Sequence, residues 1–367
     1  MSKFKIVLRV VLFIVIGIGI FCVLTNILVP KTMYTAIIEG FYKEPKNSLD
    51  VIFIGDSSIY KGISPLEIWK EHGIASYNYA SPTQKIWDSY YCIKEVLKYQ
   101  KPKVIVLNID QIYSDKPMKE GYKRHLYDNM KLSDIKIEAV TDAVQQNKMK
   151  NIISYILPFL RFHNRWNKLV DNDFQYIYGQ TYHDKNVFKG YFVAKNIKPY
   201  QKQEKKLTSK IEQKPMEYLE KIKRICEENQ IELLLLEAPA PKTWNSERHE
   251  EVEKWAQKNS ISFLDTNTIL NEIGINWETD TEDAGVHLNI KGAQKLSKYV
   301  GDYLLNHYKF TNHKNDTNYQ QWNEALRTYE EYIKNIEILK EDVKKQQDDN
   351  LRTDKTKQIM PTHKKTM

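Results

Sequence analysis

The stretch VIFIGDSS, residues 51–58, decides how this 367-residue chain folds. Four consecutive apolar residues, three of them β-branched, predict a strand that is buried on both faces, as in a parallel sheet. The Gly55-Asp56-Ser57 turn that follows predicts a switch from strand to helix. A serine in this position most often caps a helix, but it can also present a nucleophilic hydroxyl at the edge of the sheet.

Further apolar runs of strand type alternate with segments of helical period along the chain. These runs cover residues 76–79, 103–109, 232–237 and 262–264. The alternation predicts a three-layer α/β/α domain around a five-stranded parallel sheet of flavodoxin-like order. Ligands bind such sheets at the carboxyl ends of the strands. We therefore expect one edge of the sheet to gather Ser57, Ala80, Asn108 and Asp110.

The N-terminal region contains an uncharged, apolar stretch at residues 10–30. It is long enough to cross roughly 30 Å of hydrocarbon as a helix. A cleaved signal peptide is the alternative, but the stretch is longer than the usual signal-peptide core and no small-x-small site follows it. Cations precede it at Lys3, Lys5 and Arg9. The positive-inside rule therefore predicts a single-pass plasma-membrane protein with a cytoplasmic N-terminus and everything after Lys31 outside.

The composition argues against several classes of protein. The chain is 28% charged, with a net charge of +8, but its lysines and glutamates are interspersed and form no basic stripe. We therefore expect no nucleic-acid partner, and an anionic membrane surface or wall polymer suits this charge better. Cys92 and Cys226 follow Cys22 of the apolar stretch and show no metal-binding spacing, so no metal is predicted, and whether they pair stays open. No phosphate-binding loop is present, and no cofactor is predicted.

The pattern divides the chain into five parts. We expect a cytoplasmic N-terminus and membrane anchor at 1–31, a linker at 32–48, an α/β domain at 49–310, a linker with a heptad-like helix at 311–345, and a disordered tail at 346–367. The heptad-like seam repeats at alternating spacings of four and three. It consists of Trp322, Leu326, Tyr329, Ile333, Ile336 and Val343. It would pack on a partner helix or back onto the domain.

A helical insertion is expected at residues 113–214, because this segment is too long for an ordinary crossover connection. It is rich in aromatic and basic side chains, which suit sugars and anionic polymers. One interpretation is a lid or substrate platform over the sheet edge, and the other is a helical subdomain with a solvated basic face. The candidate substrate-binding residues are Arg124, His125, His163, Arg165 and Trp166.

A second motif, DAGVHLN at residues 283–289, lies just before a segment with the apolar spacing of a helix. His287 in this motif is a candidate general base for Ser57. A carboxylate would fix the histidine tautomer, and Asp283 stands four residues before the histidine. Asp280 and Glu282 are alternatives, and a Ser-His dyad is another.

Taken together and in this order, the two motifs resemble those of the SGNH/GDSL hydrolase superfamily, over about residues 50–306. The resemblance implies that Ser57 is the nucleophile, His287 the base and Asp283 its partner. It also implies oxyanion donors after the second and third strands. The matching positions are Ala80, through its backbone N–H and with Ser81 and Gln84 as neighbours, and Asn108.

Membrane-anchored members of this superfamily include proteins similar to the D-alanine-transfer protein of teichoic acids and the alginate acetylation proteins. This resemblance implies a serine esterase or acyltransferase that works through an acyl-serine intermediate on an ester of a cell-envelope glycopolymer. A transferase would need a membrane-bound O-acyltransferase as partner, because a single span cannot carry an activated acyl donor across a bilayer. The alternatives are a non-catalytic scaffold that binds polymer, and a tethering protein built around the seam at 322–343.

Overall fold

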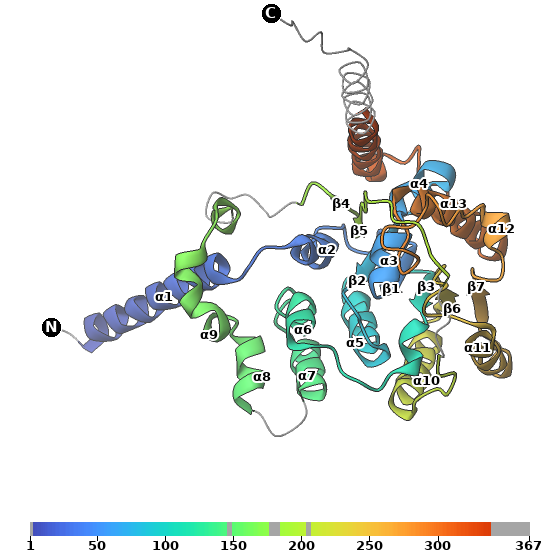
Figure 1. The fold of residues 1–367 in the computed structure, drawn as a ribbon. Helices are drawn as coiled ribbons and strands as arrows, with labels where there is room; N and C mark the ends of the chain where they lie inside the picture. The colour runs from blue at the N-terminus through green and yellow to red at the C-terminus, as the bar shows by residue number, and fades with distance from the viewer. Residues whose placement is uncertain (1–2, 145–148, 176–183, 203–206, 339–367) are drawn as a thin grey trace, which may run out of the picture. The chain divides into compact units, whose positions relative to one another are not determined.

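The computed structural model describes residues 3–144, 149–175, 184–202 and 207–338 (Figure 1). The chain forms two compact units, one up to His313 and one from Lys314. The first unit holds the sheet, the apolar N-terminal helix and all the candidate site residues.

The predicted five-stranded parallel sheet is confirmed. Its strands lie in the order β2-β1-β3-β6-β7, and every neighbouring pair is parallel. This is the flavodoxin-like order expected from the sequence. The bounds are β1 Val51–Gly55, β2 Ser76–Ala80, β3 Val104–Asn108, β6 Glu232–Glu237 and β7 Ser262–Asp265.

The central strands form the core of the domain, as their apolar runs predict. All five residues of β1 and of β3 are buried. Each fully buried Val, Leu, Ile or Phe side chain contributes about 1.5–3 kcal/mol relative to an exposed one. The pairing register sets Gly55 at the end of β1 opposite Ala80 at the end of β2, so both strands end at one edge.

Helices cover both faces of the sheet (Figure 1). On one face, α13 packs against α3 and α4. On the other face, α5 packs against α10, as right-handed crossovers require, and α11 contacts β7. The bounds are α3 Ser57–Gly62, α4 Pro65–His72, α5 Ile86–Leu97, α10 Gln213–Glu228, α11 Ser246–Lys258, α12 Leu270–Ile273 and α13 Ile290–His307. Cys92 of α5 and Cys226 of α10 are both buried free thiols, which answers the open question of their pairing.

The insertion after β3 is mainly helical, as expected. It begins with η1 Asp110–Tyr113 and continues with α6 Glu120–Tyr127, α7 Asp134–Ala143, α8 Met149–Ile156, α9 Phe159–Phe162, η2 His163–Lys168 and η3 Asp171–Phe174.

One part of the insertion departs from the helical prediction. β4 Val187–Phe188 and β5 Tyr191–Phe192 pair as an antiparallel hairpin. Its turn residues Lys189 and Gly190 have φ of 49° and 80°, and Asn78 of β2 donates its N–H to the Lys189 carbonyl at 3.1 Å. A Cβ on Gly190 would lie 2.1 Å from the Asn78 carbonyl oxygen. The conformation of this hairpin therefore depends on its contact with the edge strand β2. Local sequence propensity does not reveal such a contact.

The N-terminal helix α1, Lys3–Leu28, is long and apolar enough to cross a membrane. Residues 3–20 of this helix are exposed along their whole length. The length of α1 matches that of the predicted membrane span. A signal sequence can have the same length and apolar composition. The chain continues into α2, Met33–Phe41, which packs against β2.

The second unit contains η4, Thr317–Tyr319, followed by a helix over residues 320–338. Along this helix the residues of the predicted seam are buried or half-buried: Trp322, Leu326, Tyr329, Ile333 and Ile336. Their spacing follows one side of a helix, as the sequence indicates. Val343 and the tail predicted at 346–367 lie outside the described residues.

Candidate active site

Ser57 is the first residue of α3, directly beyond the carboxyl end of β1. The capping role falls to Asp56, whose Oδ1 accepts a hydrogen bond from the Ser58 N–H at 2.9 Å. Gly55 permits this sharp turn, because a Cβ there would lie 2.6 Å from the Cβ of Asn108. Since Asp56 caps the helix, the Ser57 hydroxyl is available for another partner.

His287 is held by a tight loop between Thr281 and Leu288, which form an isolated antiparallel bridge. Within the loop, the Glu282 N–H donates to the His287 carbonyl at 3.0 Å. Ala284 and Gly285 have φ of 65° and 91° in the left-handed region. These two residues turn the chain back so that a carboxylate four residues earlier can reach the imidazole.

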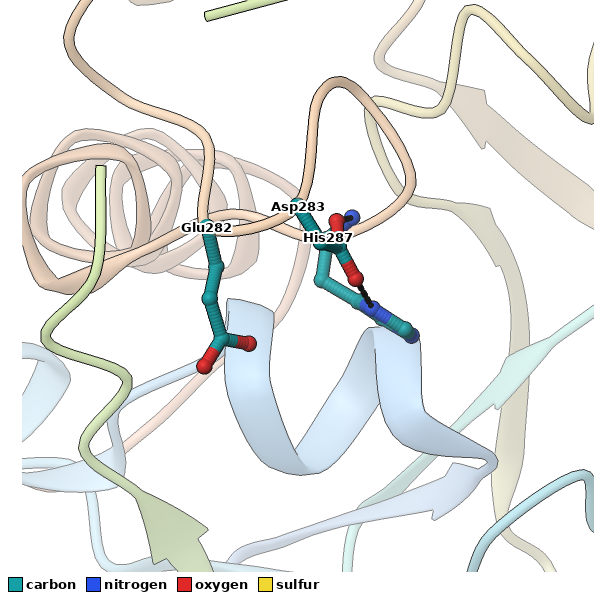
Figure 2. Close-up of side chains that lie close together, drawn as sticks. All are labelled: Glu282, Asp283 and His287. Atoms are coloured by element: carbon teal, nitrogen blue, oxygen red, sulfur yellow. Dashed lines mark hydrogen bonds and ion pairs between the residues drawn. The ribbon is translucent and has the colours of Figure 1, made fainter. Parts of the chain in front are cut away.

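The structure brings Ser57, His287 and Asp283 together as a continuous hydrogen-bonded relay. The Ser57 Oγ lies 2.7 Å from the His287 Nε2. The Asp283 Oδ2 lies 2.5 Å from the His287 Nδ1, the contact that Figure 2 marks. A proton on Nδ1, donated to the carboxylate, leaves the lone pair of Nε2 facing the serine hydroxyl. This is the arrangement in which a histidine can accept a proton from a serine.

The second oxygen of Asp283 fixes the carboxylate in place. Its Oδ1 accepts hydrogen bonds from the backbone N–H of His287 at 2.7 Å and of Val286 at 3.2 Å. Partial burial alone would raise the pKa of Asp283, but the hydrogen bonds from His287 and the nearby charges of His287 and Lys61 outweigh it and lower this pKa. Asp283 is therefore ionised at neutral pH and can stabilise an imidazolium.

The other two candidate carboxylates are engaged elsewhere. Asp280 Oδ2 accepts from the Lys295 ammonium at 2.6 Å and from the Asn276 N–H at 2.8 Å. Glu282 lies beside the imidazole without a hydrogen bond to it (Figure 2) and pairs with Lys61 of α3 at 2.5 Å. Among the three candidates, Asp283 is the one in contact with His287. The Lys61–Glu282 pair, which sequence reasoning missed, ties the histidine loop to the serine helix.

Metal binding is a second use for such a cluster, since ligand atoms of Glu282, Asp283 and His287 lie within 4.8 Å of one another. Each of these groups already has a partner within the described chain. The Asp283 carboxylate holds the imidazole, and the Glu282 carboxylate holds Lys61. The contacts therefore favour a proton relay over a metal centre.

The two predicted oxyanion donors have different surroundings. Asn108 is buried at the end of β3, and its Nδ2 donates a long hydrogen bond of 3.4 Å to Asp56 Oδ1. Just after β2, the Ser81 N–H donates to the Gly55 carbonyl of β1 at 3.3 Å, whereas within β2 the Asn78 N–H donates outward to the Lys189 carbonyl. Ala80 has the same parity as Asn78, so its N–H is directed away from β1, the strand that leads to Ser57. The geometry therefore speaks against Ala80 as a donor.

Thr83 is a further residue at this edge that sequence reasoning missed. It lies in the turn after β2, where the Gln84 N–H donates to the Ser81 carbonyl at 3.3 Å. Its φ is 51°, in the left-handed region that non-glycine residues seldom adopt. Strained backbone of this kind is concentrated at functional sites. No sequence signal could have found it, because glycine is the residue that marks such a conformation.

A polar network lies beside the serine at the same sheet edge. The Gln111 amide donates to Asp56 at 2.9 Å and to Asp110 at 2.8 Å, and Lys85 donates to the Gln111 oxygen at 2.5 Å. Burial, and then the charge of Asp56, raises the pKa of Asp110 to about 7. Asp110 thus lies at the carboxyl edge of the sheet, as expected. The network orients Asp56, which caps the helix that begins at Ser57.

The five candidate substrate-binding residues are not brought to the relay. Arg124 is buried under the Tyr155 ring, 3.7 Å from its centroid, and pairs with Asp128 at 3.1 Å. The His125 ring lies against Tyr34, with centroids 4.2 Å apart. Packing of α6 against Tyr155 of α8 and Tyr34 of α2 accounts for these contacts, and a pattern of residue types does not reveal such packing.

The remaining three residues lie near the C-terminal end of α1. Arg165 donates to the Leu28 carbonyl at 3.1 Å and to Asp173 at 2.7 Å. His163 Nδ1 contacts the Leu160 carbonyl at 3.1 Å, and the Trp166 side chain is exposed. None of the five shows a described contact with the relay, so their role in substrate binding stays a prediction.

A different part of the insertion packs on the histidine loop. The Ala284 N–H donates to the Lys198 carbonyl at 2.9 Å, and the Ile290 N–H donates to the Ala194 carbonyl at 2.9 Å. A Cβ on Gly285 would lie 2.6 Å from the Tyr200 ring. The segment 194–200 therefore supports the loop that carries His287, which is the nearest counterpart to the expected lid.

Comparisons with known proteins place these observations in context. The sequence matches no protein-family model and no curated protein. Among solved structures, the chain is similar to a Bacteroides fragilis protein named as a candidate acylhydrolase, with 12% identity, a TM-score of 0.36, and coverage of 76% of this chain and 99% of that one. It is also similar to a GDSL-like lipase from Bacteroides thetaiotaomicron, with 9% identity, a TM-score of 0.36, and coverage of 75% and 98%.

These similarities are too weak to say which reaction the chain performs. The case for its chemistry rests instead on the distances that join Ser57, His287 and Asp283.

Proposed function

We propose that this chain is a membrane-anchored serine esterase or O-acyltransferase that acts on an acyl ester of a cell-envelope glycopolymer. The observation that carries the proposal is the relay in which Nε2 of His287 lies 2.7 Å from Ser57 Oγ while Nδ1 contacts Asp283. Such a constellation is recognised by its geometry and not by sequence position. Its use here is acyl transfer through a covalent intermediate.

In the first step, Ser57 Oγ attacks the acyl carbonyl carbon while its proton passes to His287 Nε2. The carbonyl oxygen becomes negatively charged, and we propose that the Asn108 amide and the backbone N–H of Thr83 stabilise it. The ester carbon–oxygen bond then breaks, and His287 returns the proton to the leaving alcohol. Asp283 stabilises the imidazolium that exists between these events.

In the second step, the acyl-serine ester passes its acyl group to a hydroxyl. His287 takes the proton from water in an esterase, or from a sugar hydroxyl in a transferase, and that oxygen attacks the acyl carbon. The Ser57 oxygen leaves and recovers the proton, so the enzyme is regenerated. How well the site excludes water decides between these two outcomes.

The proposed location follows from α1 and the charges before it. An apolar helix of this length suits a single span, and the positive-inside rule puts the site outside the cytoplasm. An extracytoplasmic site meets envelope polymers directly. The transferase version requires a membrane-bound O-acyltransferase partner to deliver the acyl group.

Serine-directed labelling of the full chain in detergent tests the proposal. We expect a fluorophosphonate to label the wild type, and p-nitrophenyl acetate to be hydrolysed. Both signals should be lost in Ser57→Ala and kept in Ser58→Ala, the matched neighbour that contributes only its backbone N–H to the Asp56 cap. A folded wild-type chain that neither labels nor turns over would overturn the proposal in favour of a non-catalytic scaffold.

A further inference from the structure

The segment 157–170 covers only the C-terminal end of α1. Residues 3–20 of α1 are exposed, and coverage begins at Phe21, whose ring lies 5.0 Å from that of Phe159 in α9. Contacts of α1 with α9, η2 and η3 follow the same end (Figure 1). The insertion therefore meets the candidate membrane span itself, and not only the α/β domain.

The position of Phe21 shows how deep this contact reaches. Phe21 lies seven residues before Leu28, the last residue of α1. At a rise of 1.5 Å per residue this corresponds to about 10 Å along the helix. Amphipathic segments that lie in the membrane interface bury their apolar face by about 5–10 Å. With α1 in a bilayer, α9 would lie at the boundary between headgroups and acyl chains.

The outer surface of the segment has the composition of an interfacial element. Four of its large apolar side chains are exposed within 14 residues: Leu157 by 39%, Leu160 by 48%, Trp166 by 71% and Val170 by 57%. All seven tryptophans lie in the described part of the chain, and Trp166 is the one whose side chain is exposed. Tryptophan is enriched at membrane–water interfaces because its ring is apolar while its N–H stays wet.

Polar contacts fix this segment at the end of the span. Arg165 donates to the backbone carbonyls of Ile27 and Leu28 at 3.4 and 3.1 Å. The same guanidinium donates to the buried Asp173, which also accepts from the Val170 N–H at 2.9 Å. The last carbonyls of a helix lack partners within the helix. Arg165 thus closes the C-terminus of α1 and holds η2 and η3 against it.

We propose that residues 157–170 form a second membrane-contacting element, which lies in the interface beside α1 and exposes Leu157, Leu160, Trp166 and Val170 to lipid. The occupant of this surface is the bilayer, because the surface is continuous with α1 and lies at the depth of its last two turns. The inference rests on the membrane anchoring in the proposed function. It would hold the α/β domain at a set height above the membrane and limit its rotation about the span.

Lipid quenching in the full chain tests this inference. A bimane label is attached at Leu160→Cys in a Cys22→Ser background, and the protein is reconstituted in nanodiscs with doxyl-labelled lipid. Leu305→Cys is the matched control, since Leu305 is 46% exposed and Leu160 48%. Leu24→Cys, at the end of α1, reports on the anchor. We expect loss of emission at Leu160 and Leu24 and none at Leu305, with Trp166→Cys behaving as Leu160 does.

The outcomes separate the two ideas. Quenching at Leu24 without quenching at Leu160 and Trp166 would overturn the interfacial element and leave the anchor in place. Absence of quenching at Leu24 would contradict the anchoring itself, and the inference with it. Quenching at Leu305 equal to that at Leu160 would show non-specific adsorption to lipid and would also overturn the inference.

Discussion

His287 and His249 each direct Nδ1 at an aspartate, at 2.5 Å from Asp283 and 2.8 Å from Asp265. The two pairs differ at the opposite nitrogen of the ring. His287 Nε2 faces the Ser57 hydroxyl at 2.7 Å. For His249, no hydroxyl or thiol within the described chain hydrogen-bonds the imidazole, and its ring lies near that of Phe263 instead. The comparison teaches that a histidine–aspartate pair alone does not make a site.

The aspartates differ as well. Asp265 is buried at the end of β7, where its carboxylate also accepts from the Trp244 indole N–H at 2.7 Å and the Asn267 N–H at 2.9 Å. These bonds tie β7 to the neighbouring loops, which is a structural task. Asp283 instead accepts from its own loop and directs its second oxygen to the imidazole. The Asp283–His287 pair therefore has the geometry for proton transfer from Ser57, whereas the Asp265–His249 pair has contacts that hold the fold together.

Removing each imidazole in turn tests the difference between the two pairs most directly. We expect His287→Ala to lower kcat for p-nitrophenyl acetate by about 10⁶-fold, the scale of losing the base in a serine hydrolase. His249→Ala should leave kcat unchanged, because its ring contacts no part of the relay. Steady-state kinetics on both purified variants checks this. Equal losses in the two variants, with folding intact, would contradict the assignment.

Replacing each aspartate by asparagine, which has nearly the same shape, tests the role of the carboxylate charge. Asp283→Asn should lower kcat by about 10⁴-fold, because an amide cannot hold the tautomer that leaves Nε2 as acceptor. Asp265→Asn is the matched control and should affect the melting temperature more than the rate. The prediction fails if Asp283→Asn keeps wild-type turnover, in which case Ser57 and His287 would work as a dyad.

The oxyanion proposal is expected to show a smaller effect. Asn108→Ala should lower kcat by about a hundredfold or more, the usual result of removing one oxyanion donor. Its amide makes only a 3.4 Å bond to Asp56 in this structure, so it is free to turn toward a charged oxygen. Single-turnover acylation measures the effect directly. A rate within the error of the wild type would assign Asn108 to structure alone.

The smallest effect concerns Glu237, the last residue of β6. It is fully buried, neither carboxylate oxygen has a hydrogen-bond partner among the described residues, and burial raises its pKa well above the usual value. An unfolded glutamate titrates near 4.3. The folded state thus binds the proton of Glu237 more tightly than the unfolded state does. Glu237 therefore costs no stability below that pH, and its destabilising effect grows as the pH rises from there toward the folded pKa.

Glu237→Gln removes this ionisation at nearly constant shape. We expect the variant to unfold like the wild type at pH 4 and to be more stable than it at pH 8, by about 1.4 kcal/mol for each unit by which folding raises the pKa of Glu237 within this range, because glutamine has no proton to lose. Denaturant unfolding at the two pH values measures the difference. Parallel stability curves across this range would show that Glu237 is not strained in the fold.

Much of the architecture could be predicted because burial leaves a local trace in the sequence. The run at residues 51–54 reads as a strand that is buried on both faces, and the other strands follow the same rule. The hairpin at 187–192 could not be predicted this way, because it depends on docking against Asn78 of a distant strand. The helical insertion was predicted as a segment, but the contacts of Arg124 and Arg165 were not.

At the candidate site, the residue types and their order could be read from the sequence. It placed a serine after a buried strand and a histidine before a late helix, and it offered Asp280, Glu282 and Asp283 as partners. Only the tertiary structure decided among them, because the left-handed turn at Ala284 and Gly285 brings one carboxylate to the ring while Lys295 and Lys61 take the others. Hydrogen-bond geometry depends on where side chains meet in space, and spacing along the chain does not encode it.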